Sequence, residues 1–300
     1  MGAVQSVEDV LLHPAHWTAA LPAALRQVGV ADLLSPIGLA FESYGTARMM
    51  ARSPHEERRI VGKVDPPPGA EGGFALLECL PSRAVDELEA QGLSLRAVDA
   101  SMVPATVSVL KQAWCLAHAV WPELSSFVGR LVRCVHLLEA PSSDVDCSYS
   151  RPDLPFSVFL SVPGYGSHAR IERVTEALVH ETMHLQLSLL ERRIPLVDSD
   201  RPERVAFSPW RNCERNVLGV LHALYVFVMV RTLWQRAAQR APRGLDRKFA
   251  EARVRAVRDE VGRAQLLAAS PGLTYEGRHL VRQLLALGTA PIVDAPGVHH

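Results

Sequence analysis

His180-Glu181-Thr182-Met183-His184 is the segment that decides the fold, and it lies within a long amphipathic stretch from about residue 167 to residue 193. Apolar residues recur there at intervals of three and four, and Pro195 ends the pattern, so we predict a helix. Residues four apart lie on one face of a helix, which lets both imidazoles bind a single metal ion. This HExxH pattern therefore predicts a metal centre, with Glu181 beside it.

Two histidines do not complete a metal site, which needs a third protein ligand and open positions if it is catalytic. Leu187 and Leu190 stand where a metzincin peptidase carries a glycine and a third histidine, so that class is excluded. A gluzincin peptidase would take a glutamate from a following helix, for which Glu203 and Glu214 are available by distance along the chain. The carboxylate alternative therefore stays open.

His222 is the third ligand that the sequence favours. Ser208-Pro209-Trp210 is typical of a helix N-cap followed by proline at the first helical position, so we predict a second helix from there to about Arg240. One stripe of that helix would carry two arginines, a glycine and a histidine: Arg211, Arg215, Gly219 and His222. We predict that His222 joins His180 and His184 at the metal.

The two arginines on this stripe are candidates to bind a co-substrate. A guanidinium group is a planar, permanently charged fork that suits a carboxylate, and a co-substrate that chelates the metal would need such an anchor. Arg211 is the first choice and Arg215 the second. The alternative is that both are solvated residues in the first turns of a surface helix.

Five segments of the chain resemble the HExxH-type peptide β-hydroxylases, which are maturases of ribosomally made, post-translationally modified peptides. They are residues 148–155, 177–181, 185–190, 208–211 and 219–227. The similarity covers roughly residues 130–235. It implies a non-haem iron(II) centre that uses 2-oxoglutarate and oxygen to hydroxylate the β carbon of a side chain in a precursor peptide.

The chain also departs from that family. The family usually follows its Pro-Trp-Arg with an acidic pair and a proline-containing turn, whereas residues 212–216 read Asn-Cys-Glu-Arg-Asn here. The glycine expected after Pro155 is Phe156. An inactive or repurposed member that binds peptide is therefore kept as an alternative.

The role of Glu181 depends on the reaction. Common iron oxygenases use two histidines and one carboxylate, so His222 would make a three-histidine variant, and Glu181 or Glu214 would be the carboxylate otherwise. In a zinc metallopeptidase, Glu181 would be the general base that acts on a metal-bound water. In a hydroxylase it would instead orient a ligand histidine or a water.

Composition limits the class of protein. With 48% apolar and 21% charged residues, the 300-residue chain suits a soluble globular protein. The net charge is zero and there is no basic block, which argues against nucleic acid or a charged membrane surface as partner. The longest apolar run, residues 217–230, is too short to cross a bilayer, and no signal peptide is indicated, so we expect a cytoplasmic protein.

The predicted fold is α+β and mainly helical, with a small sheet near the HExxH helix and a zincin-like metal site completed by a second helix. We assign residues 1–65 to an N-terminal helical region and residues 66–300 to a metal-binding catalytic domain, which we expect to form one compact unit. The boundary is placed at the proline- and glycine-rich residues 66–73.

Further elements are predicted from hydrophobic periodicity. Helices are expected at residues 84–91, 103–121, 124–133, 249–267 and 275–287, and strands from residue 135 and at residues 156–162. We hypothesise that the strand at residues 156–162 is an edge strand that holds an extended peptide by main-chain hydrogen bonds. An ordinary core strand is the alternative.

Overall fold

The computed structural model describes residues 59–70, 75–80, 82–90, 94–96, 98–139, 147–150, 156–162, 171–191, 194–198, 205–240, 242 and 244–290. The chain divides into two compact units, and the described residues up to Gln186 belong to the first and those from Leu187 to the second. Both units are mainly helical, and the first holds a small mixed sheet, so the fold class is α+β as predicted.

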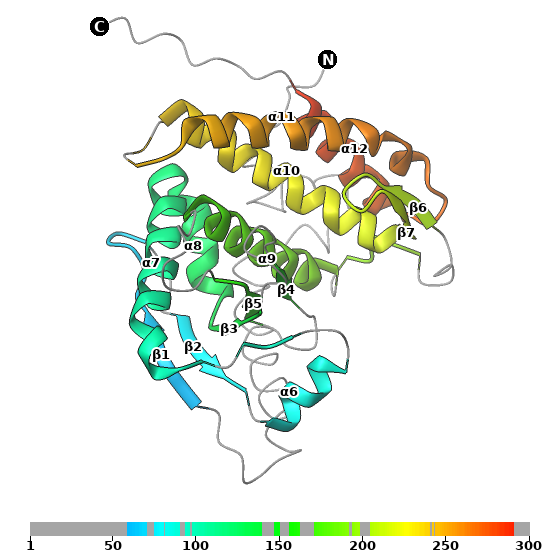
Figure 1. Ribbon diagram of the computed structural model, residues 1–300. Coiled ribbons are helices and arrows are strands. Elements are labelled where there is room, and N and C mark those ends of the chain that lie inside the picture. The colour runs from blue at the N-terminus through cyan, green and yellow to red at the C-terminus, as the bar shows by residue number, and fades with distance from the viewer. Residues whose placement is uncertain are drawn as a thin grey trace, which may run out of the picture. The chain divides into compact units, whose positions relative to one another are not determined.

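The first unit is built on a five-stranded sheet of order β1-β2-β3-β5-β4 (Figure 1). Its strands are β1 (Arg59–Val64), β2 (Ala75–Cys79), β3 (Cys134–Leu137), β4 (Ser148–Ser150) and β5 (Ser157–Leu160). The three middle strands run parallel, and β1 and β4 are antiparallel to their neighbours. Both predicted strands are present as β3 and β5.

The hypothesis that residues 156–162 form an edge strand is wrong. β5 pairs with β3 on one side and with β4 on the other, and Val158, Phe159 and Leu160 are fully buried. A continuous apolar run of this kind is typical of an interior strand covered on both faces. The last strand at this side of the described sheet is β4.

Four helices complete the first unit: α6 (Ser82–Glu89), α7 (Val103–Val120), α8 (Pro122–Leu131) and most of α9 (Ile171–Glu191). Proline stands in the first turn of both α7 and α8, where the missing N–H has no helical partner to lose. The indole of Trp114 on α7 donates to Ser125 Oγ on α8 at 3.0 Å, which fixes these helices to each other. All four helices were predicted within a few residues.

The proline- and glycine-rich stretch after residue 65 falls between two paired strands of the sheet. It connects β1 to β2, which pair as antiparallel neighbours from Arg59 opposite Cys79 to Val64 opposite Ala75. The predicted domain boundary therefore falls between two hydrogen-bonded strands. Residues 59–64 of the predicted helical region form β1, and the helices expected before them lie outside the described residues.

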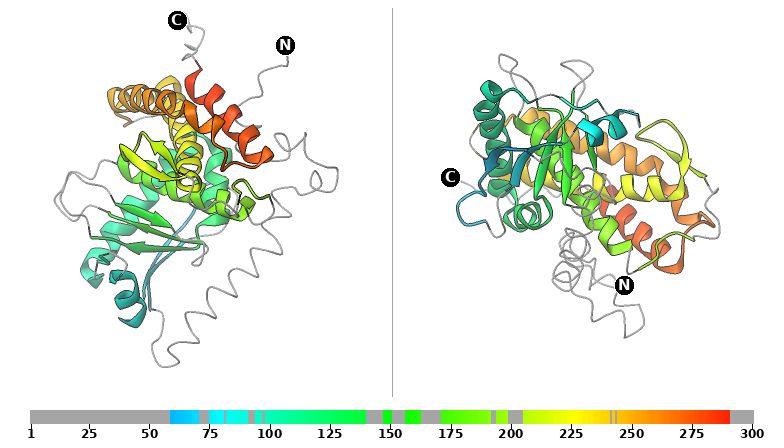
Figure 2. Two further views of the ribbon diagram at one scale, coloured as in Figure 1. Left: turned by 90° about the vertical axis from the view of Figure 1, so that its right-hand side faces the viewer. Right: turned by 90° about the horizontal axis from the view of Figure 1, so that it is seen from below.

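The second unit contains the end of α9, the hairpin β6 (Val205–Ser208) and β7 (Cys213–Asn216), and the helices α10 (Val217–Arg240), α11 (Arg247–Arg263) and α12 (Tyr275–Thr289). A short 3₁₀ helix, η3 (Gln265–Ala269), joins α11 to α12. The three long helices pack against one another (Figure 2). Arg231 links α10 to α12, because its guanidinium donates to the carbonyls of Leu287 and Ala290 at the end of α12.

The predicted start of the second helix at Pro209 is wrong. Ser208 pairs with Cys213 across the β6–β7 hairpin, and Asn212 closes the turn at φ 49°, a left-handed conformation that asparagine tolerates. The helix begins only at Val217, where Asn216 Oδ1 accepts a hydrogen bond of 2.8 Å from the amide of Gly219 and acts as the N-cap.

Helix α10 is long and apolar enough to cross a membrane, the one such helix in the part of the chain that the structure describes. The helix has 24 residues, whereas the apolar run used above to exclude a bilayer span has only 14. The length of the helix therefore does not exclude a membrane span. However, 72% of its most apolar window is buried inside the fold, as in the core helix of a soluble protein. The structure is therefore compatible with a soluble protein.

Candidate metal centre

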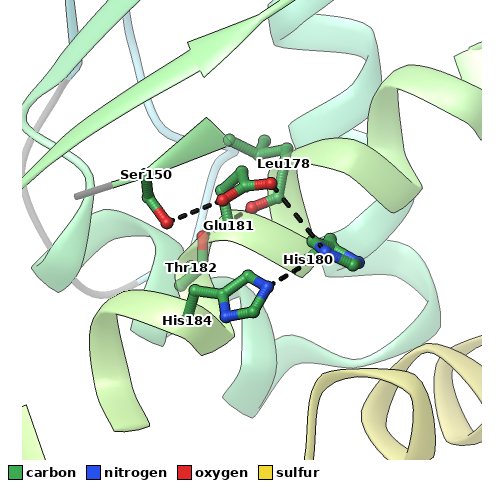
Figure 3. A network of polar contacts seen from close by, with 6 residues as sticks. All are labelled: Ser150, Leu178, His180, Glu181, Thr182 and His184. Carbon is green, nitrogen blue, oxygen red and sulfur yellow. Dashed lines mark hydrogen bonds and ion pairs between the residues drawn. The ribbon is translucent and has the colours of Figure 1, made fainter. Parts of the chain in front are cut away.

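His180 and His184 face each other on α9 in the first unit. Their Nε2 atoms are 3.1 Å apart and their ring centroids 4.8 Å apart (Figure 3). With metal–nitrogen bonds of about 2.0–2.1 Å, nitrogens at this separation subtend about 95–102° at a shared ion, between octahedral and tetrahedral angles. The pair therefore fits one metal ion, and it also fits an N–H···N hydrogen bond between neutral rings.

The helix that carries this pair is fixed by its buried side. Val179 and Met183, which adjoin the histidines in sequence, are fully buried. The hydroxyl of Thr182 donates to the Leu178 carbonyl at 2.7 Å, so a buried polar group is satisfied within the helix. Such a packed helix holds both imidazoles on a rigid support.

Glu181 lies between the sheet and the histidine pair. Its side chain is almost fully buried, its Oε2 accepts a hydrogen bond of 2.6 Å from Ser150 Oγ, and its Oε1 is 3.9 Å from His180 Nε2 (Figure 3). Burial raises the pKa of Glu181 to about 7, against the opposing effect of hydrogen bonds from Ser148 and Ser150. The carboxyl group can therefore exchange a proton near neutral pH.

His222 lies on α10 in the second unit, where its Nε2 is 2.9 Å from Glu191 Oε2. Glu191 is the last residue of α9 and was missed from the sequence. It stands seven residues after His184, two helical turns along the same face, which is the signal that could have found it. A carboxylate in this position fixes the tautomer and the orientation of the His222 ring.

The structure does not assemble a complete site. No group of three histidine, cysteine, aspartate or glutamate side chains among the described residues is placed to hold a metal ion. His180 and His184 belong to one compact unit and His222 to the other. That His222 joins the other two histidines stays a prediction.

The arginines do not lie on α10 as predicted. Arg211 is exposed in the hairpin turn, and its amide donates to the Ser208 carbonyl. Arg215 is exposed on β7, and its guanidinium carbon is 3.6 Å from where a β carbon on Gly219 would stand, one helical turn before His222. Arg215 thus lies beside the turn of α10 that precedes His222, and which arginine binds a carboxylate stays a prediction.

The structure gives no support to the remaining candidates for a carboxylate ligand of the metal. Glu214 is exposed on β7, where it lies opposite Phe207 in the hairpin. Glu203 lies outside the described residues. Two glutamates that do contact a predicted histidine ligand are Glu181, beside His180, and Glu191, beside His222.

No protein-family model matches this chain, and no curated protein matches it in sequence. What the fold and the histidine pair define is an α+β protein with an HExxH helix beside a mixed sheet.

Proposed function

We propose that this chain is a cytoplasmic, non-haem iron(II) and 2-oxoglutarate-dependent oxygenase that hydroxylates a side-chain β carbon in a ribosomally made precursor peptide. The observation that carries the proposal is the 3.1 Å separation of His180 Nε2 and His184 Nε2, which fits a shared ion. When bound, iron would activate oxygen as the oxidant, and 2-oxoglutarate would supply two of the four electrons, leaving as succinate and carbon dioxide. The resemblance to peptide β-hydroxylases supports the choice of reaction and substrate.

In this proposal the protein binds and orients the reactants. His180 and His184 would hold the metal, and His222 is the proposed third ligand through Nδ1, since its Nε2 faces Glu191. Three protein ligands leave open positions for a chelating co-substrate and oxygen. Arg211 or Arg215 would bind the distal carboxylate of 2-oxoglutarate through its guanidinium fork.

Two departures from the family have a structural explanation. Asn212 closes the β6–β7 turn in a left-handed conformation, and Asn216 caps α10. Because these two asparagines have structural roles in a turn and in a helix cap, their presence is not evidence that catalytic activity has been lost. This weakens the argument for an inactive or repurposed peptide-binding member.

The direct test is iron loading under anaerobic conditions, followed by exposure to oxygen and 2-oxoglutarate, with succinate as the product measured. We expect one iron per chain and slow succinate formation even without peptide. His180→Ala and His184→Ala should abolish both, whereas His279→Ala, a histidine on α12, should leave both unchanged. Wild-type protein that binds iron but forms no succinate would remove the oxygenase proposal.

A zinc metallopeptidase is the second candidate, and the state of Glu181 favours it. A carboxyl group whose pKa is raised to about 7 can act as a general base at neutral pH. The substitution Glu181→Gln separates the two functions, because glutamine keeps the shape and a hydrogen-bond acceptor but cannot take up a proton.

The two proposals give opposite results for this variant. A peptidase should lose about 10²–10⁴-fold in the cleavage of a fluorogenic peptide library by the zinc-loaded protein, since general base catalysis is worth that much. A hydroxylase should keep most of its succinate formation when it is assayed at saturating iron. Zinc binding with neither activity would indicate a peptide-binding protein with a structural metal.

A further inference from the structure

The last strand of the described sheet, β4, reaches the motif glutamate. Ser148 and Ser150 are two residues apart on this strand, so their side chains point to the same face. Ser150 Oγ donates to Glu181 Oε2 at 2.6 Å, and the Ser148 hydroxyl also hydrogen-bonds this carboxylate. Tyr149, between them, is partly exposed and lies opposite Phe159 of β5. Both serine side chains on this face of β4 thus hydrogen-bond to Glu181.

The two oxygens of this carboxylate have different surroundings. Oε2 is held by the strand, while Oε1 is 3.9 Å from His180 Nε2 (Figure 3). A glutamate side chain has three rotatable bonds, so burial alone does not fix which oxygen faces the histidine. The 2.6 Å contact is at the short end of O–H···O hydrogen bonds, so it holds Oε2 firmly on the strand.

We infer that Ser148 and Ser150 are positioning residues, which orient the Glu181 carboxylate so that one oxygen stays beside His180 Nε2. The inference rests on the proposed function, in which that nitrogen binds the metal. The serines touch neither metal nor substrate, and they act through Glu181. Groups that orient the surroundings of a metal ligand commonly change metal affinity by about 10–100-fold when they are removed.

The competing explanation is structural: the two hydroxyls only satisfy a buried carboxyl group. That role predicts a loss of stability and no change at His180. The readout must therefore report the His180 ring itself. Its ¹⁵N resonances in the metal-free protein do so, because the Nε2 shift depends on the tautomer and on the charge that lies next to the nitrogen.

The experiment compares Ser150→Ala, the double variant Ser148→Ala/Ser150→Ala and the conservative Ser150→Thr, with Ser157→Ala on β5 as control. All are measured at one fixed pH in EDTA. We expect the His180 Nε2 resonance to move in Ser150→Ala and further in the double variant. In Ser150→Thr, which keeps the hydroxyl, and in Ser157→Ala it should stay at the wild-type position.

Cobalt(II) titration followed by visible absorption provides a second readout. We expect the double variant to bind cobalt about tenfold more weakly than the wild type, and Ser150→Thr to bind like the wild type. Unchanged His180 resonances in the double variant overturn the inference and leave the proposed function standing. A wild-type protein that binds no cobalt overturns the proposed metal centre instead, while the resonances still decide the role of the serines. If the double variant does not fold, the His180 resonances of Ser150→Ala and Ser150→Thr are compared instead. Equal resonances in these two variants would overturn the inference.

Discussion

Replacing Glu181 by glutamine should make the metal-free protein more stable above neutral pH. Glu181 is 2% exposed, and burial raises the pKa of its carboxyl group from 4.5 to about 7. The folded chain therefore binds the proton more tightly than the unfolded chain does. Its stabilising effect is fully present below pH 4.5 and is lost as the pH rises through about 7.

The size of the effect follows from the shift. Each pKa unit corresponds to about 1.4 kcal/mol, so the ionised Glu181 should destabilise the fold above pH 8 by about 3 kcal/mol relative to the protonated form. Glutamine can still accept the hydrogen bond from Ser150 and carries no charge. The variant should thus match the wild type near pH 4.5 and exceed it by up to about 3 kcal/mol at pH 8.

Urea denaturation in EDTA between pH 4.5 and pH 8.5 measures this difference. Glu89→Gln, at an exposed position at the end of α6, is the matched control and should follow the wild-type curve. Parallel curves for Glu181→Gln and the wild type would refute the reasoning, because they would mean that the carboxyl group titrates alike in the folded and unfolded chains.

Two packing predictions can be measured by the same denaturation assay. Gly277→Ala on α12 should destabilise the fold by about 3 kcal/mol or more, because its β carbon would stand 1.9 Å from the Leu196 carbonyl oxygen. Gly262→Ala on α11, where the added carbon has no atom within 4 Å beyond its chain neighbours and its own helix backbone, should be neutral or stabilising by up to about 1 kcal/mol. Asn216→Ala should cost about 1 kcal/mol through loss of the α10 cap, and Asn216→Asp should retain most of it; equal losses would show that the cap is not formed.

Local patterns predicted the elements whose formation is decided locally. α9 and α7 were found because their apolar residues recur at helical spacing over four or more turns, and β5 because proline residues flank a short apolar run. The position of β5 within the sheet could not be predicted, since it depends on pairing with β3, which is about twenty residues away in sequence. Strand order is a property of the whole sheet.

The start of α10 shows the limit of local patterns in another way. Ser208-Pro209-Trp210 suits a helix start and a hairpin turn equally well. β7 is exposed at all four positions, without the alternation that marks a strand. What decides between them is the pairing of β7 with β6, together with the stacking of Trp210 on Phe227 at a centroid distance of 5.2 Å. Both contacts involve residues that only the fold brings together.

The same distinction separates the parts of the candidate site. The geometry of His180 and His184 follows from their spacing on one helix, so the sequence could predict it. The partners of Glu181 and His222 come from other elements: a serine of β4 holds the first and the end of α9 holds the second. Each partner is a hydrogen-bonding group that orients a side chain of the candidate site. The choice between hydroxylase and peptidase therefore depends on contacts that the HExxH motif does not contain, and the Glu181 and Ser150 variants test those contacts directly.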